Sequence, residues 1–365
     1  MRLGRMVLVV SIGLVTLASA TVASPAPDRV VERMSLREKV GQLVMFSVEG
    51  TRLTSTERSL MRRHDLGGVI LFAQNYDDRS QLQTLTNQIQ RETRGSTPHS
   101  IGALISVDQE GGPVKRFPDM PPRYSAPEIG ESGDESLAFG QGRATGRALA
   151  SVGVNVDLAP VADLDLPPNH IMRSRSFGTK PHRVGRLVSA FSRGLQARRT
   201  VATLKHFPGL GGATINSDDG RAYVRRSKRK LHNIDAIPFH KAIGDGARMV
   251  MLSHGVYLKD GGQKPASVNR YIATKRLRDE FGFEGVAISD ALEPVSWKFD
   301  GSTPRACRAT IRAGVDIALI TGDARMAGRC AAEIRQAVRA GAITQRRIDQ
   351  AVGRVLDLKR WLGLL

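Results

Sequence analysis

Short, continuous apolar runs alternate along this chain with longer stretches in which apolar residues recur at helical spacing. Continuous apolar runs are typical of parallel strands that are buried on both faces. The pattern predicts strands at 43–48, 68–72, 103–108, 154–159, 201–206, 249–254, 286–290 and 317–321. Helices are predicted at 78–93, 135–151, 183–197, 237–244, 274–281, 305–313 and 324–340.

The order of these elements predicts an α/β fold, a single TIM-type (β/α)8 barrel over residues 35–365. A doubly wound open sheet would show the same local pattern. A barrel gathers the carboxyl ends of all its strands on one face, and polar residues occur at those ends around the whole chain: Asp108, Asp157, Lys205, His206, His254 and Asp290. Ser35 and Glu38 predict a capping box at the start, and 343–365 a single closing helical segment.

The amino-terminal segment, 1–23, predicts a secretory signal peptide. Two arginines precede an apolar run at 6–18, and small residues permit cleavage after Ala20 or Ala23. A proline-containing linker is predicted at 24–34. An uncleaved membrane anchor is the alternative, although the apolar run is shorter than the roughly 20 residues that span a bilayer. We therefore expect a secreted or cell-envelope protein, outside the cytoplasm.

The charge of the chain changes the expected partners. It carries 54 Lys and Arg against 35 Asp and Glu, a net charge of +19, and six of the basic residues fall at 221–230. Such a charge favours polyanions, but the chain has no nucleic-acid motif and only 5% aromatic residues for base stacking. We expect no nucleic acid, and electrostatic association with an anionic cell wall or membrane surface. Plain solubility is the alternative, and the basic run could also be a solvated face.

Two cysteines, Cys307 and Cys330, are present in the whole sequence. In an oxidising compartment such a pair predicts a disulfide, which here would close a loop across the strand at 317–321. Two buried, unpaired thiols are the alternative.

The stretch at 204–220 places reactive side chains on a loop. Lys205 and His206 follow the apolar end of a predicted strand, which a proline and three glycines prevent from continuing. The loop ends in two neighbouring carboxylates, Asp218 and Asp219. A loop of this kind can present side chains to a ligand and close over it.

The sequence KHFPG at 205–209, with the glycines and the acidic cluster that follow, resembles the signature of glycoside hydrolase family 3. The similarity is to its single-domain bacterial β-N-acetylglucosaminidase branch and extends over roughly 35–360. It implies a secreted, retaining exo-β-N-acetylglucosaminidase that releases terminal N-acetylglucosamine from peptidoglycan fragments or related glycans. No metal-ligand spacing and no phosphate-binding fingerprint occurs, so no metal and no cofactor are expected. We expect a monomer.

A second motif, FEGVAISD at 283–290, ends a predicted strand with Asp290. It resembles the nucleophile strand of the family, which implies that Asp290 attacks the anomeric carbon and forms the glycosyl-enzyme. A carboxylate that only caps the following helix is the structural alternative. Many family members have a second acidic residue next, where this chain has Ala291.

The resemblance also implies which residues bind the sugar: Asp108, Arg116, Arg175, Lys205 and His206. The aspartate would accept hydrogen bonds from sugar hydroxyls, and the arginines would hold the sugar. Asp108 and Arg116 could instead form a structural salt bridge, and Lys205 could be an ion-pair partner. His254 also reaches the predicted mouth, either as a sugar contact or as a packed histidine behind the site.

The acid/base position departs from the family. The family loop carries a catalytic His where this chain has Asp218, and Leu210 and Asn216 replace two further loop residues. A carboxylic acid serves if it lies about 5–5.5 Å from the nucleophile and its pKa is raised. Asp219 is the alternative donor.

Two other functions stay open on the same scaffold. Without a working acid/base, the protein would be a catalytically weakened or non-catalytic sugar-binding protein. A phosphorylase, or an enzyme for a different β-glycoside, is the third candidate. A carboxylate acid repels phosphate more than a neutral His does, which disfavours phosphorolysis.

Overall fold

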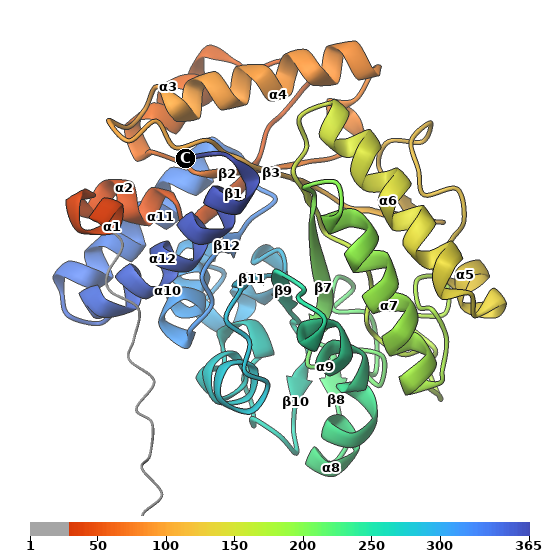
Figure 1. Cartoon of the computed structure of the whole chain (residues 1–365). Helices are drawn as coiled ribbons and strands as arrows, with labels where there is room; N and C mark the ends of the chain where they lie inside the picture. Colours follow the sequence, from red (N-terminus) through yellow and green to blue (C-terminus); the bar gives the residue numbers. More distant parts are fainter. Residues whose placement is uncertain (1–28) are drawn as a thin grey trace, which may run out of the picture.

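Eight parallel strands form a ring in the computed structural model, which describes residues 29–365 (Figure 1). A parallel bridge between Ile288 and Ile317 closes the ring. Neighbouring strands follow the order β11 (Val286–Ser289), β9 (Met249–Leu252), β7 (Val201–Phe207), β6 (Val156–Asp157), β3 (Leu104–Val107), β2 (Gly68–Leu71), β1 (Val44–Ser47) and β12 (Ala318–Leu319). The predicted (β/α)8 barrel is confirmed, and the open sheet is wrong. The predicted signal peptide, 1–23, lies outside the described residues.

Helices cover the outside of the barrel after each strand of the described chain (Figure 1). Sequence reasoning predicts all of them except α3, which has only Leu60 and Met61 as apolar residues and starts at a capping box of Thr54 and Glu57. Within residues 29–365, no helix is both long and apolar enough to cross a membrane. The covering helices are α3 (Ser55–His64), α4 (Arg79–Arg94), α6 (Glu135–Ser151), α7 (Pro181–Gln196), α9 (Ile237–Gly244), η4 (Tyr271–Glu280), α10 (Thr303–Ala313) and α11 (Ala324–Arg339).

The segment before the barrel differs from the linker predicted at 24–34. Residues Arg29–Arg33 form a short helix, α1, and both Val31 and Met34 are buried. Their apolar side chains fall on one side of a helical turn, so this part of the segment packs instead of remaining an extended linker. The predicted capping box of Ser35 and Glu38 is confirmed at the start of α2 (Leu36–Gly41).

The carboxyl-terminal helix α12 (Gln345–Leu362) packs at the amino ends of the strands. Its buried Lys359 donates hydrogen bonds to the side chain of Gln42, at 2.6 Å, and to the carbonyl of Gly67, at 2.9 Å. These two residues lie just before β1 and β2. The closing helical segment predicted at 343–365 therefore covers the end of the barrel opposite the carboxyl ends of the strands.

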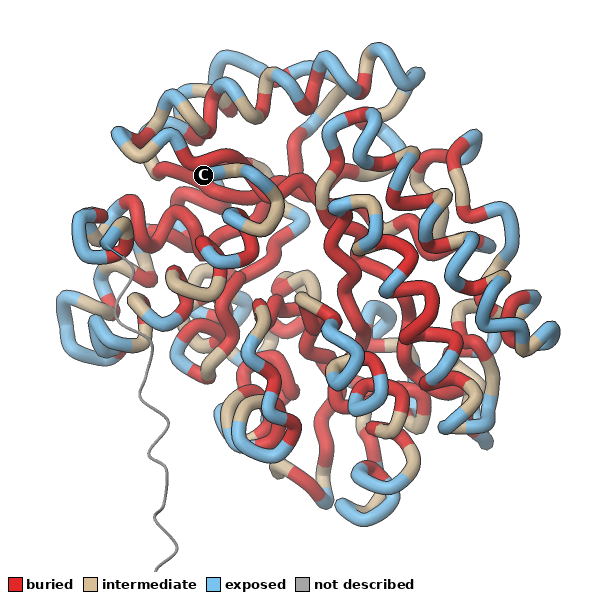
Figure 2. Tube along the Cα trace, in the orientation of Figure 1, coloured by how far each residue is buried: buried red, intermediate tan, exposed pale blue. Residues whose placement is uncertain are grey.

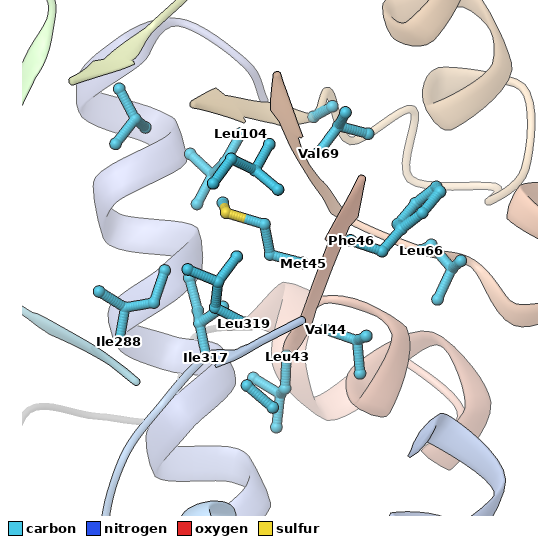
Figure 3. Packing of buried hydrophobic residues seen from close by; sticks show 14 of the residues in the cluster. Leu43, Val44, Met45, Phe46, Leu66, Val69, Leu104, Ile288, Ile317 and Leu319 are labelled. Atoms are coloured by element: carbon cyan, nitrogen blue, oxygen red, sulfur yellow. The ribbon is translucent and has the colours of Figure 1, made fainter. Parts of the chain in front are cut away.

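The core has an inner and an outer layer around the strands. In Figure 3, Met45 of β1 points toward Leu104 and Leu319, whereas Phe46 points to the other side of the strand, toward Leu66. Successive side chains of a strand alternate in this way between the barrel interior and the covering helices. Figure 2 shows buried positions along the strands and exposed ones on the outward faces of the helices. Both layers are buried, which explains why the strands appear in the sequence as continuous apolar runs.

The predicted disulfide between Cys307 and Cys330 is confirmed, and it joins α10 to α11. Both residues are fully buried, and 23 positions separate them in the sequence.

A cross-link of this span restricts the unfolded chain and stabilises the fold by about 3 kcal/mol. We expect the double variant Cys307→Ala/Cys330→Ala to lose a similar free energy of unfolding in urea titrations. A urea unfolding curve of the double variant with the midpoint and the slope of the wild type would contradict this expectation.

Candidate active site

The predicted site residues lie at the carboxyl ends of the barrel strands. Asp108 follows β3 directly, Lys205 and His206 are in the last half of β7, and Asp290 follows β11. Because all these strands are parallel, their carboxyl ends open on the same face. The barrel therefore places on one face residues that are up to 182 positions apart, as between Asp108 and Asp290.

A buried ion-pair network connects three of the predicted sugar-binding residues. The Lys205 ammonium lies 2.5 Å from an Asp108 carboxylate oxygen and 2.7 Å from one of Glu110. Arg175 donates two hydrogen bonds to Glu110, from Nε at 2.9 Å and from a terminal nitrogen at 2.7 Å. Lys205 and Arg175 are thus held side by side through Glu110. Lys205 is an ion-pair partner, as the structural alternative predicted, and it remains a candidate sugar contact.

Sequence reasoning missed Glu110, although it lies between the predicted sugar-binding residues Asp108 and Arg116. It sits in the short strand β4 (Gln109–Gly111), just beyond the end of β3. The available signal was a second carboxylate two positions after Asp108 in a segment that leaves the mouth of the barrel. Its function depends on Lys205 and Arg175, 95 and 65 positions away, which no local pattern reveals.

The charges of the network keep Glu110 and Lys205 ionised. Burial raises the pKa of the Glu110 carboxyl, but the neighbouring Lys205 and Arg175 outweigh burial and lower that pKa to about 2. For Lys205, burial lowers the pKa of the ammonium, and the charges of Asp108 and Glu110 more than offset it, so that the pKa is raised. The site thus presents fixed charges of both signs, which can accept hydrogen bonds from sugar hydroxyls and donate hydrogen bonds to sugar oxygens.

Glu110 makes the stability of the protein depend on acidity. Its pKa falls from an ordinary 4.5 to about 2 on folding, so its stabilising contribution is present above pH 4.5 and is lost as the pH falls toward 2. The contribution is on the order of 3 kcal/mol. We expect the unfolding free energy of Glu110→Gln to fall less steeply than that of the wild type between these pH values, in urea titrations at each pH. If the unfolding free energies of the wild type and Glu110→Gln fell in parallel over this pH range, the lowered pKa of Glu110 would be contradicted.

His206 is oriented by Asp163, a residue that sequence reasoning also missed. The Asp163 carboxylate accepts hydrogen bonds from His206 Nδ1 at 2.6 Å, from the His206 backbone at 3.0 Å and from the Leu210 backbone at 2.6 Å. Because Nδ1 donates to the carboxylate, Nε2 is the ring nitrogen that is left for another partner. Asp163 therefore fixes both the His206 ring and the start of the glycine-rich loop.

Asp290 is held at the mouth by backbone contacts. Its backbone nitrogen donates to the Leu252 carbonyl at 3.1 Å, and its own carboxylate accepts a hydrogen bond from the Ala291 nitrogen at 2.8 Å. Burial raises the pKa of the Asp290 carboxyl, but the charges of His254 and His206, the hydrogen bond from the Ala291 nitrogen and the charge of Lys205 together outweigh burial and lower it. An ionised carboxylate on a rigid strand end is the form that nucleophilic attack requires.

His254 acts on the segment that carries Asp290. Its Nε2 donates a hydrogen bond to the carbonyl of Ala291, and its Nδ1 lies 2.8 Å from the Ser267 hydroxyl. Both ring nitrogens are therefore engaged, and only 4% of the residue surface is exposed. Of the two functions left open by the sequence, this geometry supports the packed histidine behind the site.

Arg116 is separate from the ion-pair network. Its guanidinium carbon lies 5.7 Å from the centre of the Phe72 ring, and its Nε is buried without a hydrogen-bond partner among the described residues. The structural salt bridge with Asp108, considered as the alternative, does not form in this part of the chain, since Asp108 pairs with Lys205. The guanidinium of Arg116 remains available to a ligand.

The structure does not bring Asp218 into this network. Asp218 is exposed, and its polar contacts within 29–365 are two 3.4 Å hydrogen bonds with the Asn216 side chain. Asp219 is also exposed, and its backbone nitrogen donates to the Asn216 carbonyl. The assignment of either residue as acid/base stays a prediction.

Two contacts hold the loop that carries Asp218. A bridge between Ala213 and Val224 closes its base. Three residues before Val224, the Arg221 guanidinium stacks on Trp297, 4.1 Å from the ring centre. Trp297 belongs to η5 (Glu293–Phe299), which begins three residues after Asp290. The loop that carries Asp218 is therefore coupled by a cation–π contact to the segment that follows the candidate nucleophile.

Comparisons with known proteins agree with this architecture. Residues 35–358 match the model of the glycosyl hydrolase family 3 N-terminal domain. A β-hexosaminidase of Thioalkalivibrio sulfidiphilus is 34% identical over 293 residues, covering 78% of this chain and 82% of the relative. A family 3 β-N-acetylglucosaminidase from a Paenibacillus species superposes with a TM-score of 0.85 at 31% identity, over 91% of this chain and 63% of the other.

A second solved structure matches over nearly its whole length. The β-N-acetylhexosaminidase of Beutenbergia cavernae has a TM-score of 0.81 at 27% identity, and the match covers 90% of this chain and 99% of that one. The barrel of this protein is therefore found on its own in a solved relative. With a family model matched over most of its length and a relative above 30% identity, this chain belongs to glycosyl hydrolase family 3.

Proposed function

We propose that this glycoside hydrolase is a retaining exo-β-N-acetylhexosaminidase with Asp290 as its nucleophile. The observation that carries the proposal is the position of the Asp290 carboxylate, fixed at the barrel mouth on the face that also carries the network of Asp108, Glu110, Arg175 and Lys205. The names of the relatives, β-hexosaminidase and β-N-acetylglucosaminidase, support the sugar class.

The reaction follows from this placement. The Asp290 carboxylate attacks the anomeric carbon while the bond to the leaving group breaks, which forms a covalent glycosyl-enzyme. Water then displaces Asp290 and restores the original configuration at the anomeric carbon. Asp108, Lys205 and Arg175 hold the sugar hydroxyls, and His206 offers Nε2 to the substrate because Asp163 occupies Nδ1. Arg116 adds a guanidinium whose Nε has no hydrogen-bond partner among the described residues.

The leaving group needs a proton, which we assign to Asp218. In the structure Asp218 is exposed and bonded only to Asn216 among the described residues, so the loop must move to bring its carboxyl over the sugar. Catalytic hydrogen bonds often tighten only when substrate binds. The same exposure favours the second candidate function, a catalytically weakened sugar-binding protein.

Leaving groups of different acidity separate these two functions. With Asp218→Ala we expect kcat for a poorly activated alkyl or phenyl β-N-acetylglucosaminide to fall by roughly 10²–10⁴-fold, the usual contribution of general acid catalysis. An activated dinitrophenyl substrate needs little protonation and should form the glycosyl-enzyme at nearly the wild-type rate. Asp219→Ala is the matched control, since it removes the neighbouring exposed carboxylate. Equal kinetics of the wild type and Asp218→Ala on the poor leaving group would contradict the assignment.

We further propose that the enzyme works outside the cytoplasm on peptidoglycan fragments. The supports are the signal-peptide pattern at 1–23 and the net charge of +19, which suits an anionic wall. Amino-terminal sequencing of the protein recovered outside the cytoplasm should begin after Ala20 or Ala23. Release of N-acetylglucosamine from muropeptides, measured beside release from chitobiose, tests the substrate. Activity on chitobiose alone would refute the peptidoglycan part and leave the sugar class intact.

A further inference from the structure

A cavity of about 310 Å³ lies at the amino ends of β11 and β12, the end of the barrel opposite Asp290. Its walls come from η4, the end of α10 and the start of α12. Gly314, just before β12, and Thr344, the N-cap of α12, lie in its lining. No acidic residue lines it among the described residues, and six arginines do: Arg270, Arg278, Arg312, Arg346, Arg347 and Arg354.

The inner three arginines share a single carboxylate. The fully buried Asp316 lies 2.6 Å from Arg278, 3.0 Å from Arg347 and 3.2 Å from Arg354. One negative charge therefore faces three positive ones. Burial lowers the pKa of the Arg278 guanidinium to about 10, with the charges of Arg354 and Arg347 acting in the same direction and Asp316 opposing them.

The outer three arginines have no counter-charge among the described residues. Arg270, Arg312 and Arg346 are exposed, and their side chains form no hydrogen bond or ion pair within residues 29–365. Deeper in, the Nε of Arg278 is buried without a hydrogen-bond partner. A salt-bridge cluster that fastens α12 to η4 explains the contacts of Asp316, but it does not explain three further arginines around the same cavity.

We propose that this cavity binds a multivalent anion of phosphate type, a function separate from glycoside hydrolysis. Guanidinium groups bind phosphate oxygens through paired N–H donors, and six of them converge here on a concave space. The volume is near the lower end of the roughly 300–1,000 Å³ typical of small-molecule sites. The start of α12 adds the positive end of an 18-residue helix. A soluble phosphate compound and a lipid headgroup share this chemistry.

Calorimetric titration with inorganic pyrophosphate tests the site, at a constant ionic strength of about 0.15 M to limit unspecific attraction. We expect saturable binding to the wild type and at least tenfold weaker binding to Arg312→Ala/Arg346→Ala. The matched control is Arg63→Ala/Arg91→Ala, which removes two exposed charges on α3 and α4, and should bind within about twofold of the wild type. No binding by the wild type, or equal weakening by both double variants, would overturn the proposal.

Two further measurements identify the source of the anion and separate this site from catalysis. Sedimentation with phosphatidylglycerol vesicles that is lost in Arg312→Ala/Arg346→Ala would assign a lipid headgroup. Pyrophosphate binding without such sedimentation would assign a soluble phosphate compound. Hydrolysis of an aryl β-N-acetylglucosaminide should be equal in the wild type and this variant, because the cavity lies at the other end of the barrel. If Arg312→Ala/Arg346→Ala lost hydrolysis to the same extent as pyrophosphate binding, the proposal of a site separate from catalysis would be overturned.

Discussion

Replacing Asp290 with alanine is expected to reduce kcat for an aryl β-N-acetylglucosaminide by roughly 10⁴-fold or more, since no covalent intermediate can form. The substitution removes a carboxylate at the end of β11 and leaves the strand and its pairing with β9 intact. Sodium azide should restore part of the activity, because azide can enter the vacated space and attack the anomeric carbon. The product would then be the α-glycosyl azide, which NMR identifies.

The exposed carboxylate Asp279 provides the control. It lies on η4, pairs only loosely with Lys275 at 3.7 Å, and is far from the mouth in the fold, so Asp279→Ala should keep wild-type kcat. If Asp290→Ala retained turnover within about tenfold of the wild type, the nucleophile would be a different residue. A β-configured azide product would equally contradict attack from the side of Asp290.

Replacing Lys205 with methionine is expected to destabilise the fold by about 3–5 kcal/mol, as happens when one partner of a buried ion pair is removed. Lys205 is 2% exposed and contacts two carboxylates, of which Glu110 keeps Arg175 as a partner. Asp108 would lose the only ion pair that it forms in the described chain. Urea unfolding measures the stability, and KM for the aryl substrate should rise because the proposed sugar contact of Lys205 is lost.

The double variant Lys205→Met/Asp108→Asn tests the cause of this loss. Asparagine keeps the shape of the aspartate and removes its negative charge, so part of the lost stability should return. A total loss in the double variant that equals the sum of the two single losses would show that packing, and not the unpaired charge, determines the cost. Both single variants are needed for the comparison.

Much of the barrel follows from the sequence, because each buried strand leaves a continuous apolar run. The runs at 201–206 and 249–254 correspond to β7 and β9 within two residues at either end. Helix α3 leaves no such signal: its ten residues are mostly polar, and its boundaries depend on the capping box of Thr54 and Glu57. Burial of Val31 likewise turns part of the predicted linker into a helix.

The site shows a different limit of sequence reasoning. Asp108, Lys205 and Asp290 were accessible because each lies near the carboxyl end of a continuous apolar run. Glu110 and Asp163 were not, because they bind side chains that the fold brings from other parts of the chain. The six arginines of the cavity at the amino ends of β11 and β12 are also spread over 85 positions, between Arg270 and Arg354. Only the closed barrel brings them together.

The loop that carries Asp218 could be predicted from the sequence only in part. Its glycines and its two carboxylates are visible in the sequence, but the position of Asp218 depends on contacts such as that of Arg221 with Trp297. In the structure this contact couples the loop to the segment after Asp290 while Asp218 itself remains exposed. The leaving-group series described above tests the proposed movement of Asp218 toward the sugar.

The most direct test of the proposed function is to trap the covalent intermediate. The protein would be treated with a fluorinated N-acetylglucosaminide that carries an activated leaving group, digested, and mapped by mass spectrometry. We predict one sugar per protein, attached to the peptide that contains Asp290 through an ester of its carboxylate. Attachment to another carboxylate would contradict the assignment of Asp290. Turnover of the reagent with inversion at the anomeric carbon would contradict the retaining mechanism itself.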